Sequence, residues 1–135
     1  MALSLSGLKG MSAPLAKKMR GRGIEHSDHF LNAVRTPQQR RDLANQLGAS
    51  ENTILELANR ADLARVIGIG KIYSDLLEKA GVDTIKEMAN RVPENLHATL
   101  GKQNSKRRPK GRAPSMKEVT DWINQAKALP KLLEY

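Results

Sequence analysis

Apolar residues recur at intervals of three and four along most of the chain, a spacing typical of helices with one buried face. The clearest stretches are Leu43, Ala44 and Leu47; Ile54, Leu57, Ala58 and Ala61; Leu96 and Leu100; and Met116, Val119, Ile123 and Ala126. Helix-starting residues stand before them, at Thr36-Pro37, Ser50, Pro93 and Ser115. Asp83 is expected to cap a further helix that carries Ile85, Met88, Ala89 and Val92. The pattern predicts an all-α fold of about seven to eight short helices.

The stretch from Val66 to Gly81 predicts a tight reversal between two helices. A polar helical segment, residues 59–65, runs into Val66 and Ile67, and Gly68-Ile69-Gly70 then turns the chain. The next helix is expected to bury Ile72, Leu76, Leu77 and Ala80 and to end at Gly81, because glycine suits a left-handed helix end. We refer to residues 66–71 as the hairpin.

The hairpin offers a place for an anion. Gly68 and Gly70 let the backbone turn tightly and approach a partner closely, and Ile69 is expected to fill the gap between the helices. The first amides of the following helix have no intrahelical acceptor and lie at the positive end of its dipole. A phosphate therefore fits there, beside Lys71. A turn that only packs two helices is the alternative interpretation.

Parts of this arrangement repeat along the chain. Residues 42–60 and 75–91 share a pattern of like residues, shifted by 33 and then by 31 positions. We therefore expect two helix pairs that share a core. Gly7-Leu8-Lys9-Gly10 resembles a degenerate earlier hairpin, and Ser12 and Pro14 are suited to begin the helix after it. The basic side of that helix holds Lys17, Lys18, Arg20 and Arg22.

Basic residues concentrate at the two ends of the chain. The net charge is +9, with +6 in residues 1–41, −3 in residues 42–94 and +6 in residues 95–135. Residues 101–114 contain no acid and two prolines, and their basic residues are Lys102, Lys106, Arg107, Arg108, Lys110 and Arg112. We expect a basic loop that contacts phosphates, with a solvated linker as the alternative.

Two other groups of residues carry smaller expectations. Arg35, Arg40 and Arg41 are expected on the exposed side of the helix that begins at Pro37. His26 and His29 are three residues apart, but no third ligand is near them in the sequence, so a metal site is not expected.

The hairpin resembles a known DNA-binding motif. Gly68-Ile69-Gly70, with the small Ser74 four places later and then Leu77, is similar to the helix-hairpin-helix motif of non-specific DNA-binding domains. In that motif, hairpin amides hold a backbone phosphate, often with a bound cation. The resemblance implies that Gly68, Ile69, Gly70 and Lys71 form a phosphate site.

Nearly the whole chain resembles an uncharacterised, mainly bacterial family of proteins with tandem helix-hairpin-helix units. The matching blocks are Ala61–Arg65 with the hairpin, Asp75–Glu78, Ala80–Thr84, Glu94–His97, Asp121–Ile123, Gln125–Lys127 and Leu129–Tyr135. The length predicts one helical domain, 1–135, and the C-terminal helix is expected to fold back on the core to bury its apolar stripe. Its parts would be a degenerate first unit (4–35), a repeat pair (36–100), the basic loop (101–114), and a C-terminal helix and tail (115–135).

Two functions remain open at this point. The first is a non-enzymatic module that binds backbone phosphates of nucleic acid without reading sequence, with DNA favoured over RNA, through the hairpin and the basic loop. The second is a protein-interaction or assembly subunit whose basic ends dock on an acidic protein, or on RNA within a larger assembly, with the hairpins as packing elements. The few aromatic residues argue against stacking on single strands.

Enzymatic chemistry is not expected, because the sequence offers no catalytic set, metal spacing or phosphate loop after a strand. No cofactor is expected. No apolar run approaches the ~20 residues that span a bilayer, so membrane insertion is not expected. The expected location is cytoplasmic, with nucleoid association and import into an organelle as open alternatives, since residues 1–24 contain no acid.

Overall fold

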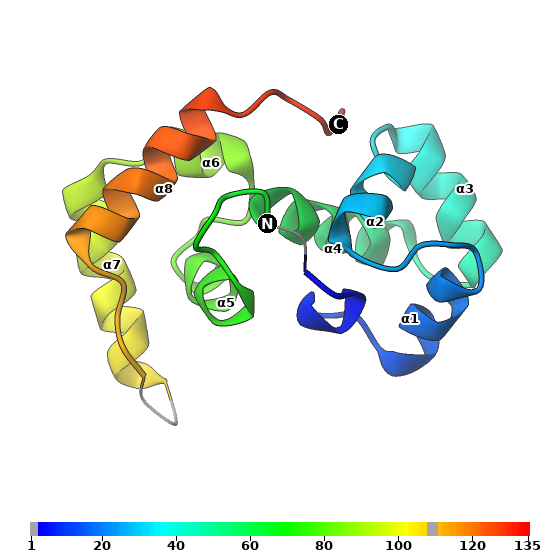
Figure 1. The fold of residues 1–135 in the computed structure, drawn as a ribbon, viewed down its shortest axis with the longest axis horizontal. Helices are drawn as coiled ribbons and strands as arrows, with labels where there is room; N and C mark the ends of the chain where they lie inside the picture. The colour runs from blue at the N-terminus through cyan, green and yellow to red at the C-terminus, as the bar shows by residue number, and fades with distance from the viewer. Residues whose placement is uncertain (1–2, 108–110) are drawn as a thin grey trace.

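The computed structural model describes residues 3–107 and 111–135, and within these ranges the chain is helical and contains no strand. A short 3-10 helix and eight α-helices follow one another (Figure 1): η1 (Leu5–Gly7), α1 (Ala13–Arg20), α2 (Ser27–Ala33), α3 (Pro37–Leu47), α4 (Glu51–Leu63), α5 (Lys71–Lys79), α6 (Ile85–Ala89), α7 (Pro93–Lys106) and α8 (Met116–Ala128). The all-α expectation is confirmed. No described helix is long and apolar enough to span a membrane.

The helices form two halves, each with its own hydrophobic cluster. One cluster lies among η1 and α1–α4, and the other lies among α5–α8 and includes Leu63 at the end of α4. The two copies of the sequence repeat therefore lie in different clusters, and the expectation that they share one core is wrong. The 13 residues of α4 extend for roughly 20 Å, which separates the helices that α4 joins.

The predicted helix ends are mostly confirmed. The Thr36 and Ser115 side chains each form a reciprocal capping box, with Gln39 and Glu118 respectively. Gly48 and Gly81 stand at the ends of α3 and α5 with positive φ, as the repeat predicts. In both copies the residue after the glycine donates to a carbonyl five positions earlier: Ala49 to Ala44 at 3.0 Å, and Val82 to Leu77 at 2.8 Å.

The cap of α6 differs from the prediction. The Thr84 hydroxyl, and not Asp83, accepts the amide of Glu87 at 3.1 Å. A threonine one residue closer to the helix meets the N3 amide, which the preceding aspartate cannot do from outside the helix. The helix also ends at Ala89, so Val92 lies beyond it and is 52% exposed instead of buried.

Arg40 is buried, contrary to the expectation that it lies on the exposed side of α3. Its guanidinium donates to the carbonyl oxygens of Val34 (2.9 Å), Arg35 (3.3 Å) and Glu134 (2.5 Å). These acceptors meet the hydrogen-bonding needs of a buried arginine, so the charge is tolerated there. Arg35 and Arg41 are exposed as expected.

The C-terminal tail, residues 129–135, returns from α8 to the first half of the molecule (Figure 1). Leu133 is buried in the first cluster, and the amide of Glu134 donates to the carbonyl of Arg35 at 2.7 Å. The Tyr135 hydroxyl donates to the Asn59 side chain at 2.5 Å. Helix α8 itself packs on α6 and α7, which confirms that the C-terminal helix folds back on the core. The tail therefore fastens the two halves together.

Candidate nucleic-acid interface

The hairpin is a compact turn between α4 and α5. Val66 and Ile69 are fully buried, and the amide of Ile69 donates to the carbonyl of Val66 at 3.2 Å. Gly68 has a φ of +102°, a conformation that side chains other than glycine rarely adopt. Ile69 joins the second hydrophobic cluster, as the sequence predicts, so its side chain is unavailable to a partner.

One side of the hairpin is held by α8. The Gln125 amide group accepts from the amide of Ile67 at 2.8 Å and donates to its carbonyl at 3.0 Å. The Trp122 indole packs against Gly68, where its Nε1 lies 2.9 Å from the position that a Cβ would occupy. The α8 side of the hairpin is thus filled by the protein itself.

The other side of the hairpin opens to solvent. Gly70 is the N-cap of α5 and supplies no side-chain acceptor to the amides of the first turn. Lys71 is exposed there, and so is Ile72, at 55%. The prediction that Ile72 is buried is wrong: Leu76 and Leu77 are the deeply buried apolar residues of α5, and Ile72 lies on the first turn, outside the cluster.

The predicted basic loop is partly helical. Helix α7 continues through Gly101 to Lys106, so Lys102 and Lys106 lie exposed on its last turns. Lysine and glutamine favour helix, and Pro109 opposes helix at its own position and at the residue before it, so the helix can continue to Lys106, further than predicted. The predicted site residues Arg108 and Lys110 lie outside the described residues.

Asn104 anchors the chain where it returns from α7. Its side chain is 3% exposed and donates to the carbonyl of Gly111 at 2.8 Å. The same side chain accepts from Nε of Arg107 at 3.2 Å. Arg107 and Gly111 are thereby held close to the end of α7, and the segment that follows is directed towards α5.

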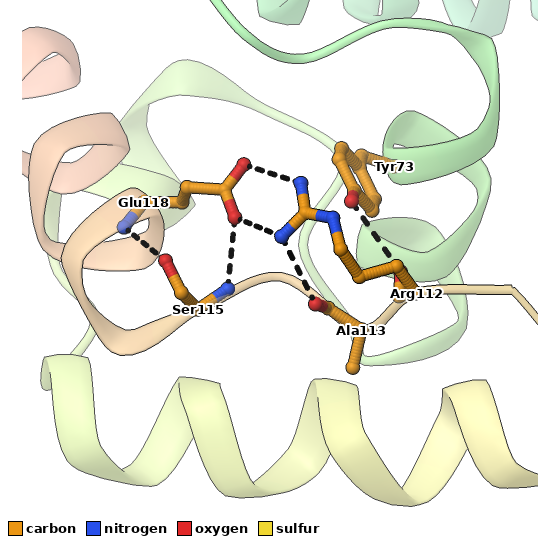
Figure 2. A network of polar contacts seen from close by, with 5 residues as sticks. All are labelled: Tyr73, Arg112, Ala113, Ser115 and Glu118. Atoms are coloured by element: carbon orange, nitrogen blue, oxygen red, sulfur yellow. Dashed lines mark hydrogen bonds and ion pairs between the residues drawn. The ribbon is translucent and has the colours of Figure 1, made fainter.

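The returning segment contacts the first turn of α5 (Figure 2). The Tyr73 hydroxyl donates to the carbonyl of Arg112 at 3.3 Å, and the Arg112 guanidinium lies 6.0 Å from the centroid of the Tyr73 ring. The guanidinium also makes two hydrogen bonds to the Glu118 carboxylate, at 2.6 and 3.0 Å. Figure 2 shows Arg112 between Tyr73 of α5 and Glu118 of α8, so the chain at Arg112 lies against the first turn of α5.

The Arg112–Glu118 pair changes the charge that the site offers. Hydrogen bonds from Arg112 and from the backbone of Ser115 lower the pKa of Glu118 to about 2, and the pair raises the pKa of Arg112. At neutral pH both groups are charged and their charges largely cancel. Arg112 therefore positions the segment more than it adds net positive charge.

Carboxylates near α5 have cationic partners too. Burial opposes ionisation of Asp75, but the hydrogen bond and charge of Lys9 and the charge of Lys79 outweigh it, so its pKa is lowered. Glu78 pairs with Arg60, which is buried at the end of α4. The contact between Lys9 and Asp75 also brings the degenerate first hairpin against α5. The carboxylates of α5 are therefore paired with cations, whereas Asp121 of α8, which accepts from the Gln125 side chain at 2.8 Å, has no ion pair within the described residues.

Of the predicted loop residues, the structure brings Arg112 against α5. At the hairpin, Lys71 is exposed, Gly70 is half-buried and Ile69 is buried, whereas Gly68 is exposed but has Trp122 where a Cβ would point. The predicted residues Lys102, Lys106 and Arg107 lie at the end of α7. Sequence reasoning missed Tyr73 and Asn104, which hold the basic segment, and Gln125, which holds the hairpin. A polar residue at a buried position of an amphipathic helix, as at Asn104, is the signal that points to such a contact.

The two histidines singled out in the sequence stack with ring centroids 3.8 Å apart. Within 3–107 and 111–135, no group of three metal-ligating side chains comes together.

Comparison with protein families gives a match over most of the chain. The family model described as Domain of unknown function (DUF4332) matches residues 9–129, from the first hairpin to the end of α8. No solved structure matches the chain.

Proposed function

Because the chain belongs to the DUF4332 family, which has no assigned function, we propose from its own surface that it binds nucleic acid without catalysing a reaction. The binding would use backbone phosphates of a duplex, DNA in preference to RNA, and would not depend on base sequence. The observation that carries the proposal is the contact of Arg112 with Tyr73, because it sets the basic segment beside the open first turn of α5.

The two parts of this surface complement each other. The first amides of α5 offer hydrogen-bond donors at the positive end of a helix dipole, as helix-hairpin-helix motifs do for phosphates. Lys71, Lys102 and Lys106 are exposed and have no ion pair within the described ranges. A polyanion that reaches both parts gains several phosphate contacts, which are the main source of sequence-independent affinity.

Base recognition has little support in the surface. Trp122 and Phe30 are buried, and the Tyr73 ring is partly covered by Arg112. Tyr135 is exposed, but it lies at the end of the tail, where its ring faces Arg40 and its hydroxyl donates to Asn59. Stacking platforms for single strands need exposed aromatic faces, so a duplex is the preferred substrate.

The test is a titration of a fluorescein-labelled DNA duplex of arbitrary sequence, read by anisotropy at 50 and 200 mM salt. If about four phosphates are neutralised, the affinity falls on the order of a hundredfold between these salt concentrations. Lys71→Gln and Lys102→Gln should each weaken binding at low salt and reduce the salt dependence. Lys86→Gln, on α6, is the control with the same charge change and should bind like the wild type. Absent or salt-independent binding at 50 mM would refute the proposal.

A second candidate function, protein interaction, is favoured by the apolar residues at the hairpin. Ile67 is 67% exposed and Ile72 is 55% exposed, one on each side of Gly68–Gly70. A partner protein that covered both would remove apolar surface from water. Affinity purification after nuclease treatment distinguishes the two functions. A partner that survives nuclease and is lost with Ile72→Ser supports this second function.

A further inference from the structure

A cavity of about 920 Å³ lies between α6, the end of α4, the end of α8 and the C-terminal tail. Figure 1 shows the tail crossing on the side of α6, whereas η1 and α5 lie on the other side of the molecule. The cavity is therefore separate from the candidate nucleic-acid interface. Its volume falls within the range of small-molecule sites, which is roughly 300–1,000 Å³.

The tail closes one side of the cavity and is fixed at both ends. Near α8, Nη1 of Arg65 donates to the carbonyl of Pro130 at 2.9 Å. At the far end, Leu133 is buried, and Glu134 bonds to α3 through Arg40 and to the carbonyl of Arg35. A wall held in this way keeps its shape without a ligand, which reduces the entropy cost of binding.

A buried ion pair forms part of the cavity wall. Asp62 is 5% exposed, and its Oδ1 lies 2.8 Å from Nε and 2.6 Å from Nη2 of Arg65. Burial raises the pKa of Asp62, and the charge and hydrogen bond of Arg65 act against that rise. The Nη2 atom of Arg65 is buried but makes no hydrogen bond within the described part of the chain, despite its closeness to Asp62. Because Nη2 is buried against Asp62, Arg65 contributes the positive charge of its guanidinium to the cavity wall.

The rest of the lining combines positive charge with apolar surface. Lys86, Lys127 and Lys131 line the cavity from α6, α8 and the tail, and all three are exposed at its rim. With Arg65 they make four cations against the single carboxylate of Asp62 among the lining side chains. The apolar part of the lining is Ile85, Ala89, Ala126, Leu129, Leu132 and Leu133.

We propose that this cavity binds a small amphipathic anion, with its phosphate or carboxylate head at the lysines and Arg65 and its apolar body against α6 and the tail. Neither half of such a ligand suffices alone. The head gains from the cations only if the body removes apolar lining from water, and the body gains specificity only from the charged head. A polar anion without an apolar body, or a neutral apolar molecule, should bind much more weakly.

Isothermal titration calorimetry with naphthyl phosphate tests the proposal on the full chain. We expect naphthol and inorganic phosphate to bind at least tenfold more weakly, and naphthoate shows whether a carboxylate head replaces the phosphate. The double variant Lys127→Gln with Lys131→Gln should weaken binding of naphthyl phosphate at least tenfold. Both lysines are exposed, so the variant is expected to fold, and its circular dichroism spectrum checks this.

Lys71→Gln is the matched control, because it removes the same charge at the hairpin and should leave naphthyl phosphate binding unchanged. The duplex assay should show the reverse: Lys71→Gln should weaken duplex binding, and the double variant should leave it unchanged. The cavity proposal is overturned if naphthol binds as tightly as naphthyl phosphate, if the double variant binds like the wild type, or if neither naphthyl phosphate nor naphthoate binds at millimolar concentration. Each of these results leaves the duplex assay, and so the proposed function, to be decided separately.

Discussion

Replacing Gly68 with alanine tests the geometry on which the hairpin depends. Gly68 has a φ of +102°, and forcing an L-residue with a Cβ into positive φ costs about 1–2 kcal/mol. The new Cβ would also lie 2.9 Å from Nε1 of Trp122, closer than such atoms approach in proteins. Relief of that contact requires either the hairpin or the indole to move.

The indole has little room to move. Trp122 is 2% exposed and belongs to the second hydrophobic cluster, with Ile69 and Leu77 among its members. Overpacking a filled core typically costs about 1–3 kcal/mol. Together with the backbone strain, Gly68→Ala should lower the free energy of unfolding by about 2–4 kcal/mol, a large part of the 5–15 kcal/mol typical of domains. The melting temperature should fall by roughly 10 °C.

The matched control is Gly70→Ala, at the other glycine of the same turn. Gly70 has a φ of −100°, and no atom lies within 4 Å of a Cβ built there. Because Gly70 is an N-cap, its replacement by alanine should lower the free energy of unfolding by at most about 1 kcal/mol. Urea unfolding of both variants, followed by circular dichroism, measures the difference.

Fluorescence of Trp122, the single tryptophan, reports whether the indole has moved. The emission should shift in Gly68→Ala and stay unchanged in Gly70→Ala. If the two variants unfold at the same urea concentration, or if Gly68→Ala is as stable as the wild type, the tight packing of the hairpin against α8 is refuted.

Three further outcomes follow from the Arg112–Glu118 ion pair and from the hydrogen bonds of Arg40. Glu118→Gln should lower the free energy of unfolding by less than about 1 kcal/mol, because both side chains of the pair are partly exposed. The same variant should strengthen duplex binding at low salt, because the charge of Arg112 is no longer paired. Unchanged or weaker binding would contradict the assigned pairing. The pKa of Glu118 is lowered from 4.5 to about 2, so the stability that its carboxylate gives the fold is complete above pH 4.5 and is lost as the pH falls towards 2. The urea midpoints of the wild type and of Glu118→Gln should therefore converge over that range. A constant difference between the two midpoints would argue against the lowered pKa. Arg40→Ala should lower the free energy of unfolding by about 2–4 kcal/mol and expose the tail to protease, because it removes the donor to one buried and two partly buried carbonyl groups. Arg41→Ala, at an exposed neighbour, should change the free energy of unfolding by less than about 0.5 kcal/mol.

Local chemistry was predictable from the sequence. The capping boxes at Thr36 and Ser115 and the helix ends at Gly48 and Gly81 each depend on residues within a few positions of one another. Such features appear in the sequence because a helix end is satisfied by its own neighbours. They were sufficient for the helix order and for the position of the hairpin.

Features that depend on distant partners were not predictable in the same way. Arg40 lies on the same face of α3 as Leu43 and Ala44, and its burial was missed because an arginine is ordinarily assigned to solvent. One acceptor that makes its burial possible, the Glu134 carbonyl, is 94 positions away in the tail. Tyr73 and Arg112 are 39 positions apart, and neither residue type alone indicates the contact. The end of α7 is a different case. The glycine and prolines after Lys106 led to the prediction of a loop from residue 101, although the helix propensity of residues 101–106 was sufficient to continue α7.

The arrangement of charge decides more about function than the net charge of +9 does. Among the described cations, several are used within the fold, either buried as Arg40 and Arg60 or paired as Lys9, Lys79 and Arg112. Two groups of exposed lysines have no ion pair within the described ranges. Lys71 lies on the first turn of α5 and Lys102 and Lys106 lie at the end of α7, whereas the lysines of the second group line the cavity beside the tail. These two groups lie on different sides of the molecule, so we expect them to bind different anions. Charge-removing variants at one place should therefore leave binding at the other intact, which makes the duplex and the small-anion assays independent tests.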